Sequence, residues 1–245
     1  MTAERAYAEV ERLTRRRARN FAYGIMVLPR EKRRRLNELR AQLDAAPGED
    51  AMLVALADAR TRFPIPRPAL EALVEGGLQD LHQARYASFD ALHGYCTKVA
   101  GAVGAACVAV YGSDDVQRAK TLGIALQLIN IMRDVREDWE LGRVYLPQDE
   151  LSSFGVSEDD IAARNVSPAW HALMTFQAER ARAYLADGLG LLHSLDSRSA
   201  LCVSTFAGLY RATLDRIEAR GFDVFDGPPR LSTLTKLRIV GQGLW

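Results

Sequence analysis

The sequence has few of the features that mark secreted, zinc-binding or membrane-spanning proteins. Its three cysteines lie far apart without a CxxC pair, so it predicts neither a disulfide framework nor a zinc site. The first residues contain no apolar segment of the kind found in signal peptides. The longest apolar run, residues 99–111, is shorter than the about 20 residues that cross a bilayer, so we expect a fully buried helix there. These absences indicate a cytoplasmic protein, with at most a peripheral contact with membranes.

Excess charge and strand patterns are also scarce. The formal net charge is +1, which indicates no nucleic-acid partner. Apolar residues make up 48% and charged residues 26%, values that fit a globular domain with a sizeable core and exclude a disordered chain. Few stretches alternate with a period of two, so a sheet is not expected.

Helical periodicity is what the sequence does contain. Apolar residues recur every three to four positions, and proline-rich or glycine-rich breakers separate the periodic segments. The expected helices span residues 4–19, 36–43, 51–60, 68–82, 88–111, 114–139, 157–162, 168–195 and 198–220. No internal repeat or long linker divides the chain. We therefore predict one all-α domain over residues 1–245, with a central cavity walled by the helices at 88–111, 114–139 and 198–220.

The segment 125–151 carries the clearest chemical signal. Asn130, Asp134 and Asp138 are spaced by four residues, so one helix face presents an amide and two carboxylates in a row. Like charges one turn apart repel each other, and a divalent cation would offset that repulsion. Oxygen ligands of this kind suit Mg²⁺, which binds through carboxylates together with substrate phosphates.

The same spacing also occurs on ordinary solvated helix faces. In that interpretation Asp134 and Asp138 are paired with nearby arginines, the candidates being Arg133, Arg136 and Arg143. Spacing alone does not decide between a metal site and a surface of ion pairs.

The longer string LQLINIMRDVREDWELGRVYLP, residues 126–147, resembles the second aspartate-rich signature of the squalene/phytoene synthase family. Three further segments are similar to that family: 19–33 to its opening, 85–104 to its YCxxVAGxVG segment, and 210–225 to its closing helix. The opening is most similar to the bacterial presqualene diphosphate synthase branch. The resemblance implies an isoprenoid-synthase-like helical bundle around a central apolar cavity.

The resemblance also implies an activity and a set of site residues. Two prenyl diphosphates would be joined head to head with Mg²⁺, farnesyl diphosphate giving presqualene diphosphate or squalene. The implied metal ligands are Asn130, Asp134 and Asp138. Catalytic roles are implied for Tyr95, Arg133 and Tyr210, and substrate binding for Asn20, Phe21, Asp80, Gln127 and Arg133. Use of NADPH stays open, because reducing members of the family also lack a GxGxxG fingerprint.

One departure from the family pattern stands out. The family has a first aspartate-rich motif, RxxDDxxD, soon after its opening segment, whereas here LPREKRRR runs directly into LNELRAQLDAAP. Either an aspartate-rich helix is omitted between Arg33 and Leu36, which we favour, or the chain lacks half of the metal site. Two alternative functions follow: a phytoene synthase that uses geranylgeranyl diphosphate, or an inactive helical homologue that serves in assembly as a scaffold.

Overall fold

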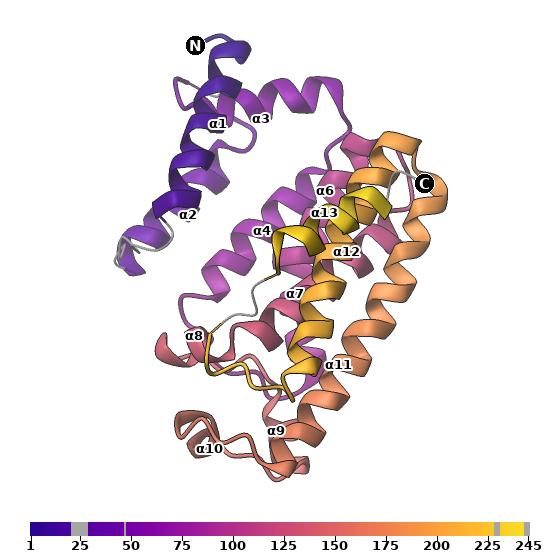
Figure 1. Ribbon diagram of the computed structural model, residues 1–245. Helices are drawn as coiled ribbons and strands as arrows, with labels where there is room; N and C mark the ends of the chain where they lie inside the picture. The colour runs from indigo at the N-terminus through magenta and orange to yellow at the C-terminus, as the bar shows by residue number, and fades with distance from the viewer. Residues whose placement is uncertain (21–28, 47, 228–230, 243–245) are drawn as a thin grey trace.

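The structure is a bundle of α-helices, as the sequence predicts (Figure 1). This computed structural model describes residues 1–20, 29–46, 48–227 and 231–242. Within these ranges the β contact is limited to one isolated parallel bridge between Arg85 and Val144, which joins two loops. The fold class is therefore all-α.

The elements follow one another along the chain with short connections. They are α1 (Ala3–Asn20), α2 (Pro29–Gln42), α3 (Ala51–Arg62), α4 (Arg67–Gln79), α5 (Phe89–Cys96), the π-helical turn η1 (Thr97–Gly101), α6 (Ala102–Tyr111), α7 (Val116–Arg133), α8 (Val135–Glu140), α9 (Gln148–Ser153), α10 (Glu158–Ala162), α11 (Pro168–Leu189), the 3₁₀ turn η2 (Gly190–Ser194), α12 (Ser197–Ala219) and α13 (Thr233–Gln242).

Helix α7 lies at the centre of the bundle. It packs along α11 on one side and along η1 and α6 on another, and α12 also contacts it. Ile129 and Met132 of α7 are almost fully buried and join the main core with Trp170 of α11. The Trp170 indole N–H donates a hydrogen bond of 3.0 Å to the backbone carbonyl of Phe222, so this buried donor is satisfied.

The first helices form a lobe beside the bundle (Figure 1). Helix α1 packs on α3 through a small cluster around Ala6 and Val54. Helix α2 contacts α4, where Arg40 forms an ion pair of 2.6 Å with Glu71. Asp50 caps α3 by accepting hydrogen bonds from two backbone amides of its first turn.

The predicted helices differ from the structure in five places. The helix expected at 36–43 already begins at Pro29, and the one expected at 114–139 is divided at Asp134 into α7 and α8. The helix expected at 88–111 contains the π turn η1, in which the Ala102 N–H bonds the carbonyl of Thr97, five residues earlier. Helix α9 was not predicted because it is short and polar in sequence, and α13 was not predicted because threonines and β-branched residues weaken its helical pattern.

The expectation that residues 99–111 form a fully buried helix is wrong. Val103 and Val110 are 43% and 41% exposed, and Cys107 is also exposed. The helical stretch Phe89–Tyr111 contains this run. It has 23 residues and a mean hydropathy of 1.2 over an 18-residue window, so it is long and apolar enough to cross a membrane by length and composition alone. Its contacts with α4 and α7 give it the position of a core helix with one open face.

Two glycines let α6 and α7 approach each other closely. A Cβ atom on Gly104 would lie 2.1 Å from the backbone oxygen of Ala119, and one on Gly123 would lie 2.3 Å from that of Ala100. Both distances are far below contact distance, so a side chain at either position would force the helices apart. The small-residue segment thus serves helix packing, and its other face borders the site described next.

Candidate functional site

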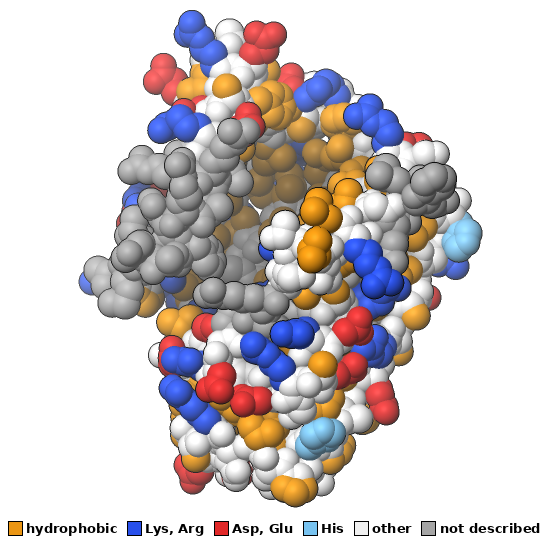
Figure 2. All heavy atoms as spheres, viewed as in Figure 1, with side chains coloured by type: hydrophobic (Ala, Val, Ile, Leu, Met, Phe, Trp, Pro, Cys, Tyr) orange, Lys and Arg blue, Asp and Glu red, His pale blue; other side chains and the backbone are white. Residues whose placement is uncertain are grey.

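An apolar cavity of about 510 Å³ lies between the stretch η1–α6, helix α7 and helix α12. These walls are the ones that the sequence predicts. Figure 2 looks into a hollow lined by hydrophobic side chains, between the N-terminal helices and α13. The lining residues are Val99, Ala100, Val103, Gly104, Cys107, Val108, Tyr111, Ala119, Leu122, Gly123, Leu126, Gln127, Asn130, Leu191, Cys202, Val203, Phe206, Ala207 and Tyr210.

The cavity has a polar end, where α7 carries Gln127 and Asn130. The Asn130 side-chain amide donates a long hydrogen bond of 3.4 Å to the Gln127 side-chain oxygen. The Asn130 Oδ1 atom is buried and has no hydrogen-bond partner. A buried acceptor without a partner is costly, so this oxygen is poised to accept a ligand.

Arg133 and Asp134 lie one turn beyond Asn130, where α7 ends. Two guanidinium nitrogens of Arg133 donate to the two carboxylate oxygens of Asp134, each at 2.6 Å. Both side chains are about 30% exposed. The hydrogen bond to Asp134 raises the pKa of Arg133, against the opposing effect of burial. The ion pair with Arg133 that the surface interpretation expects for Asp134 is therefore present in the structure.

Asp138, one further turn along, is in a different environment. Burial raises its pKa to about 7, and the negative charges of Asp134, Glu137 and Asp80 act in the same direction. Arg143 opposes the shift without cancelling it. Asp138 is therefore a carboxylate that a bound cation would stabilise in its charged form.

The raised pKa of Asp138 predicts how the stability of the ligand-free protein changes with pH. Because the folded state holds the proton up to about pH 7 and the unfolded chain releases it near pH 4, the free energy of unfolding falls as pH rises through that window. Urea unfolding at about pH 5.5 and about pH 8 should show this loss in the wild type. In Asp138→Asn the loss should be smaller, and equal slopes in the two proteins would contradict the assignment.

Asp80 follows α4 and meets this group from another part of the chain. Its carboxylate accepts a hydrogen bond of 2.9 Å from the Tyr145 hydroxyl, and its backbone carbonyl accepts one of 3.2 Å from Arg143. These contacts place Asp80 beside the loop that follows the carboxylate helix.

Tyr95 belongs to a buried cluster of three tyrosines, one of which, Tyr145, donates to Asp80. Its ring stacks on that of Tyr145 at 5.4 Å and contacts that of Tyr86 at 5.3 Å. Burial, followed by the neighbouring Tyr145 hydroxyl, raises the pKa of Tyr95, so its phenol stays neutral. Tyr95 is 4% exposed and does not line the apolar cavity, so we assign it the role of positioning Tyr145.

Tyr210 on α12 closes the polar end of the cavity from the opposite wall. It lines the cavity, contacts the ring of Phe206 at 5.5 Å, and lies close enough to Arg133 to act on its charge. For two other predicted binding residues the structure gives no side-chain position. Asn20 is the last residue of α1, with its side chain outside what the structure describes, and Phe21 lies outside the described residues.

The sequence pattern does not mark Tyr145 as a member of the site, and it suggests Arg143 only as an ion-pair partner. Both lie in the GRVYLP end of the quoted signature, which was a signal for them. A backbone hydrogen bond brings this loop to the site. The Val144 N–H donates to the Ala84 carbonyl at 2.9 Å, beside the isolated β-bridge between Arg85 and Val144. This long-range contact is not visible in helix periodicity.

The donor set fits one side of a Mg²⁺ site. The Asn130 oxygen is buried and unpaired, and Asp134 and Asp138 follow it on the same helical path. In the part of the chain that the structure describes, no three His, Cys, Asp or Glu side chains converge closely enough to hold a metal by themselves. The oxygens of this wall therefore need phosphate, water or further carboxylates to complete a coordination sphere.

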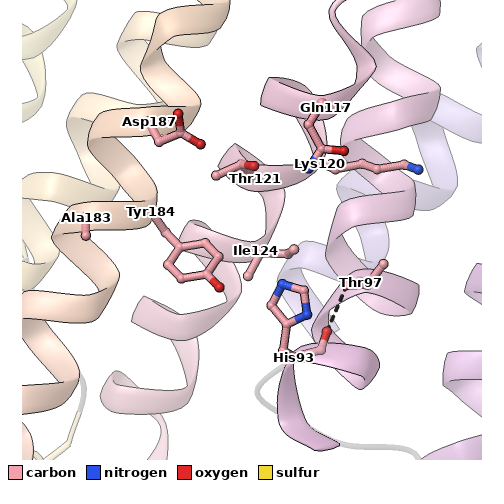
Figure 3. Close-up of a pocket in the computed structure, with 9 residues that line it drawn as sticks. All are labelled: His93, Thr97, Gln117, Lys120, Thr121, Ile124, Ala183, Tyr184 and Asp187. Carbon is pink, nitrogen blue, oxygen red and sulfur yellow. Dashed lines mark hydrogen bonds between the residues drawn. The ribbon is translucent and has the colours of Figure 1, made fainter. Parts of the chain in front are cut away.

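A second pocket, of about 520 Å³, lies on the opposite face of α7 (Figure 3). Its lining residues are His93, Thr97, Gln117, Lys120, Thr121, Ile124, Ala183, Tyr184 and Asp187. In Figure 3 the Lys120 side chain points away from Tyr184 and Asp187. No residue predicted for the site lines this pocket, so the candidate site is the apolar cavity with its polar end.

The chain is similar to known proteins over nearly its whole length. A family model described as squalene/phytoene synthase matches residues 28–236. A phytoene synthase of Mycobacterium tuberculosis is 38% identical over 275 residues, which covers 98% of this chain and 91% of the relative. A 15-cis-phytoene synthase of Synechococcus elongatus is 35% identical over 277 residues, with 95% and 90% covered.

Solved structures also resemble this fold. A dehydrosqualene synthase in complex with ligand has a TM-score of 0.81 at 25% identity, covering 85% of this chain and 76% of that one. A squalene synthase from Alicyclobacillus acidocaldarius has a TM-score of 0.71 at 26% identity, covering 76% and 72%.

The lengths of these alignments bear on the missing aspartate-rich motif. The match to the M. tuberculosis relative is 275 residues long and this chain has 245, so at least 30 residues of the relative have no counterpart here. Arg33 and Leu36, between which the sequence predicts an omitted helix, lie within the continuous helix α2. The acidic side chains Glu31 and Glu38 of α2 are paired with Arg34. Helix α2 therefore does not supply the missing carboxylates.

Proposed function

Because the chain belongs to the squalene/phytoene synthase family, whose members are prenyltransferases that join two prenyl diphosphates head to head, we propose that it condenses two geranylgeranyl diphosphates to phytoene. The proposal takes the substrate that sequence analysis held as the alternative to farnesyl diphosphate. The names of relatives that are 38% and 35% identical over nearly the whole chain favour it. Condensation to phytoene transfers no hydride, so the proposal includes no NADPH.

The observation that carries this proposal is an apolar cavity that ends at a buried, unpaired side-chain oxygen of Asn130. It runs along α7 from Ala119 to Asn130, which at 1.5 Å per residue is about 16 Å. An isoprenoid tail suits the apolar walls, and its diphosphate suits the end where Asn130 and Arg133 lie. A water-poor cavity also protects a carbocation from capture by solvent.

The residues at the polar end would have different roles in binding and ionising the diphosphate. Asn130, Asp134 and Asp138 would hold Mg²⁺, which as a Lewis acid neutralises the charge that develops on the leaving diphosphate. Arg133 has a planar guanidinium that matches phosphate oxygens once Asp134 turns to the cation.

The aromatic side chains have separate tasks. Phe206 and Tyr210 line the cavity, where aromatic rings can stabilise a substrate cation. Tyr145 donates to Asp80 and is held by Tyr95, which fixes the position of the Asp80 carboxylate beside Asp138.

Product analysis tests the proposed function. The 245-residue chain is incubated with Mg²⁺ and either geranylgeranyl or farnesyl diphosphate, and the lipid products are separated. Phytoene as the main product is the expected result. Faster conversion of farnesyl diphosphate would contradict the proposed substrate and favour a squalene-type product. No product from either substrate would contradict the condensation itself.

The far end of the cavity is expected to select the chain length of the substrate. Cys107 lines the cavity and is exposed, so Cys107→Phe places a large ring inside without displacing core side chains. We expect the kcat/KM ratio of geranylgeranyl over farnesyl diphosphate to fall about tenfold, since a difference of this size matches the loss of a few methylene contacts. Cys107→Ser is the control for loss of the thiol, and an unchanged ratio in Cys107→Phe would place the tail elsewhere.

A second candidate function is an inactive helical homologue that acts in assembly. Two observations favour it. At least 30 residues of the M. tuberculosis relative have no counterpart in this chain, and the candidate metal-binding carboxylates of the described residues lie on one wall of the cavity. A graft separates the two functions: a helix with the family's aspartate-rich motif RxxDDxxD is inserted between Arg33 and Leu36. Product formed by the graft but not by the 245-residue chain would support the inactive homologue, whereas comparable turnover would support the enzyme.

A further inference from the structure

Helix α13 covers α12 with one face and leaves the other face unpartnered. Where the two helices cross, a Cβ atom on Gly208 would lie 2.8 Å from the Ile239 side chain, so the contact is tight. Thr235 and Ile239 are the partly buried positions on this inner face. Helix α13 is therefore fixed to the bundle, and its outer face is a stable part of the surface.

The outer face of α13 is apolar and strongly exposed. Leu234, Leu237 and Val240 are 80%, 64% and 43% exposed. Because successive helix residues are rotated by about 100°, these three side chains fall within an arc of about 120°. Large apolar side chains gathered in this way on a surface mark an interaction site.

Cations flank this apolar face on both sides. Counting about 100° per residue, Lys236 lies next to Val240 at one edge and Arg238 lies next to Leu234 at the other. The sequence of α13, TLTKLRIVGQ, contains no acidic residue. An apolar stripe between basic flanks is the pattern of helices that lie in the interface of a membrane.

The apolar face of α13 lies beside the opening of the cavity (Figure 2). Phe206 of α12 and Val103 of α6 line that cavity and are 54% and 43% exposed. Phe206 precedes by two residues the glycine on which α13 is seated. The apolar surface thus extends from the cavity wall across its rim to the outer face of α13.

We propose that the outer face of α13 binds the surface of an anionic lipid bilayer and holds the cavity opening against the membrane. Leu234, Leu237 and Val240 enter the interfacial region, while Lys236 and Arg238 contact lipid headgroups. The binding surface stands on the geometry of α13. Its use, the transfer of a long apolar product from the cavity into the lipid, rests on the function proposed above.

The charges favour a bilayer over a second copy of the chain. In a two-fold dimer through this face, the same patch meets itself, so Lys236 and Arg238 of one copy would approach those of the other. No acidic residue on α13 would offset that repulsion. An anionic lipid surface complements the flanks and the stripe together.

Co-sedimentation of the full chain with vesicles tests the proposal. Vesicles of equal parts phosphatidylglycerol and phosphatidylcholine are expected to bind most of the protein, and vesicles of phosphatidylcholine alone at least about fivefold less. Leu234→Ser with Leu237→Ser, and separately Lys236→Gln with Arg238→Gln, are each expected to lower binding to the anionic vesicles by at least about fivefold. High salt should release the wild type, since the headgroup contacts are screened.

Met52→Ser with Val166→Ser is the matched control, because it removes two exposed apolar side chains far from α13 in sequence. This variant is expected to bind like the wild type, and equal loss in the control would overturn the proposal. No binding of the wild type to anionic vesicles would also overturn it. So would a wild-type dimer that the Leu234 and Leu237 variant abolishes, because it would assign the face to a second copy.

Turnover with detergent-dispersed substrate separates this proposal from the proposed function. The α13 variants are expected to keep wild-type turnover there, because α13 does not line the cavity. Vesicle binding without turnover would refute the function alone, and turnover without vesicle binding would refute the membrane surface alone.

Discussion

Asp134→Asn and Asp138→Asn are each expected to lower the turnover of a prenyl diphosphate with Mg²⁺ by at least about 100-fold, with the fold intact. Each substitution replaces a charged oxygen ligand by a neutral one at the polar end of the cavity, where no nearby carboxylate of α2 is free to compensate. The two variants should differ in stability. Asp134→Asn loses the ion pair with Arg133 and keeps an acceptor for only one of its two hydrogen bonds, whereas Asp138→Asn removes a buried carboxylate and should unfold at higher urea concentration than the wild type at about pH 8.

Steady-state kinetics and urea unfolding measure these effects, and Glu140→Gln is the matched control. Glu140 ends α8, is 52% exposed and pairs with Arg136, so it is an acidic neighbour outside the site. The control is expected to keep turnover within about twofold of the wild type. Wild-type rates in both aspartate variants, or an equal loss in Glu140→Gln, would contradict the assignment of the carboxylates as metal ligands.

Gly104→Ala is expected to destabilise the fold by about 3 kcal/mol. The new Cβ would lie 2.1 Å from the backbone oxygen and 2.7 Å from the backbone carbon of Ala119, and neither backbone atom can turn away. Helices α6 and α7 must separate, and overpacking of this kind costs about 1–3 kcal/mol or more. Thermal unfolding should show a melting temperature lower by about 10 °C.

Gly94→Ala is the control, because Gly94 is also helical but its Cβ would meet nothing within 4 Å. Alanine stabilises an open helix position by about 0.5–1 kcal/mol relative to glycine, so this variant should melt at a slightly higher temperature. A loss of stability in Gly94→Ala as large as that in Gly104→Ala would show that close helix contact is not the cause.

The helices could be predicted because their signals are local. Amphipathic spacing, caps such as Asp50 and prolines at first-turn positions lie within each segment, and they place most helices within a few residues. Helix α13 escaped prediction because threonines and β-branched residues weaken its helical pattern. Its formation depends on the contact of Ile239 with α12, which is a tertiary effect.

The site divides in the same way into local and long-range parts. Asn130, Asp134 and Asp138 are one turn apart, and the backbone keeps this path through the break at Asp134, since Asp134 and Asp138 each donate to the carbonyl four residues before. The approach of Asp80 to Tyr145 joins residues 65 positions apart, and no periodic pattern shows it. The family resemblance pointed to Asp80, whereas its partner Tyr145 is found only in the structure.

The open face of residues 99–111 shows where composition misleads. Thirteen apolar or small residues in a row predict burial on all sides, but Val103 and Cys107 line the apolar cavity. Hydrophobicity reports that a surface avoids water. It does not report whether protein or substrate covers that surface.

The π turn at Thr97–Gly101 gives this wall an unusual tolerance to a change in chain length. A π turn holds one more residue than an α turn, so the segments before and after it keep their faces, with Tyr95 toward the tyrosine cluster and Val103 toward the cavity. Deletion of one residue within Thr97–Gly101 would convert it to an α turn and preserve both faces. The same deletion in α7, which is α-helical throughout, would rotate every later side chain by about 100° and turn Asn130 out of the site. The wall therefore carries a position at which the gene could lose a codon without losing the cavity.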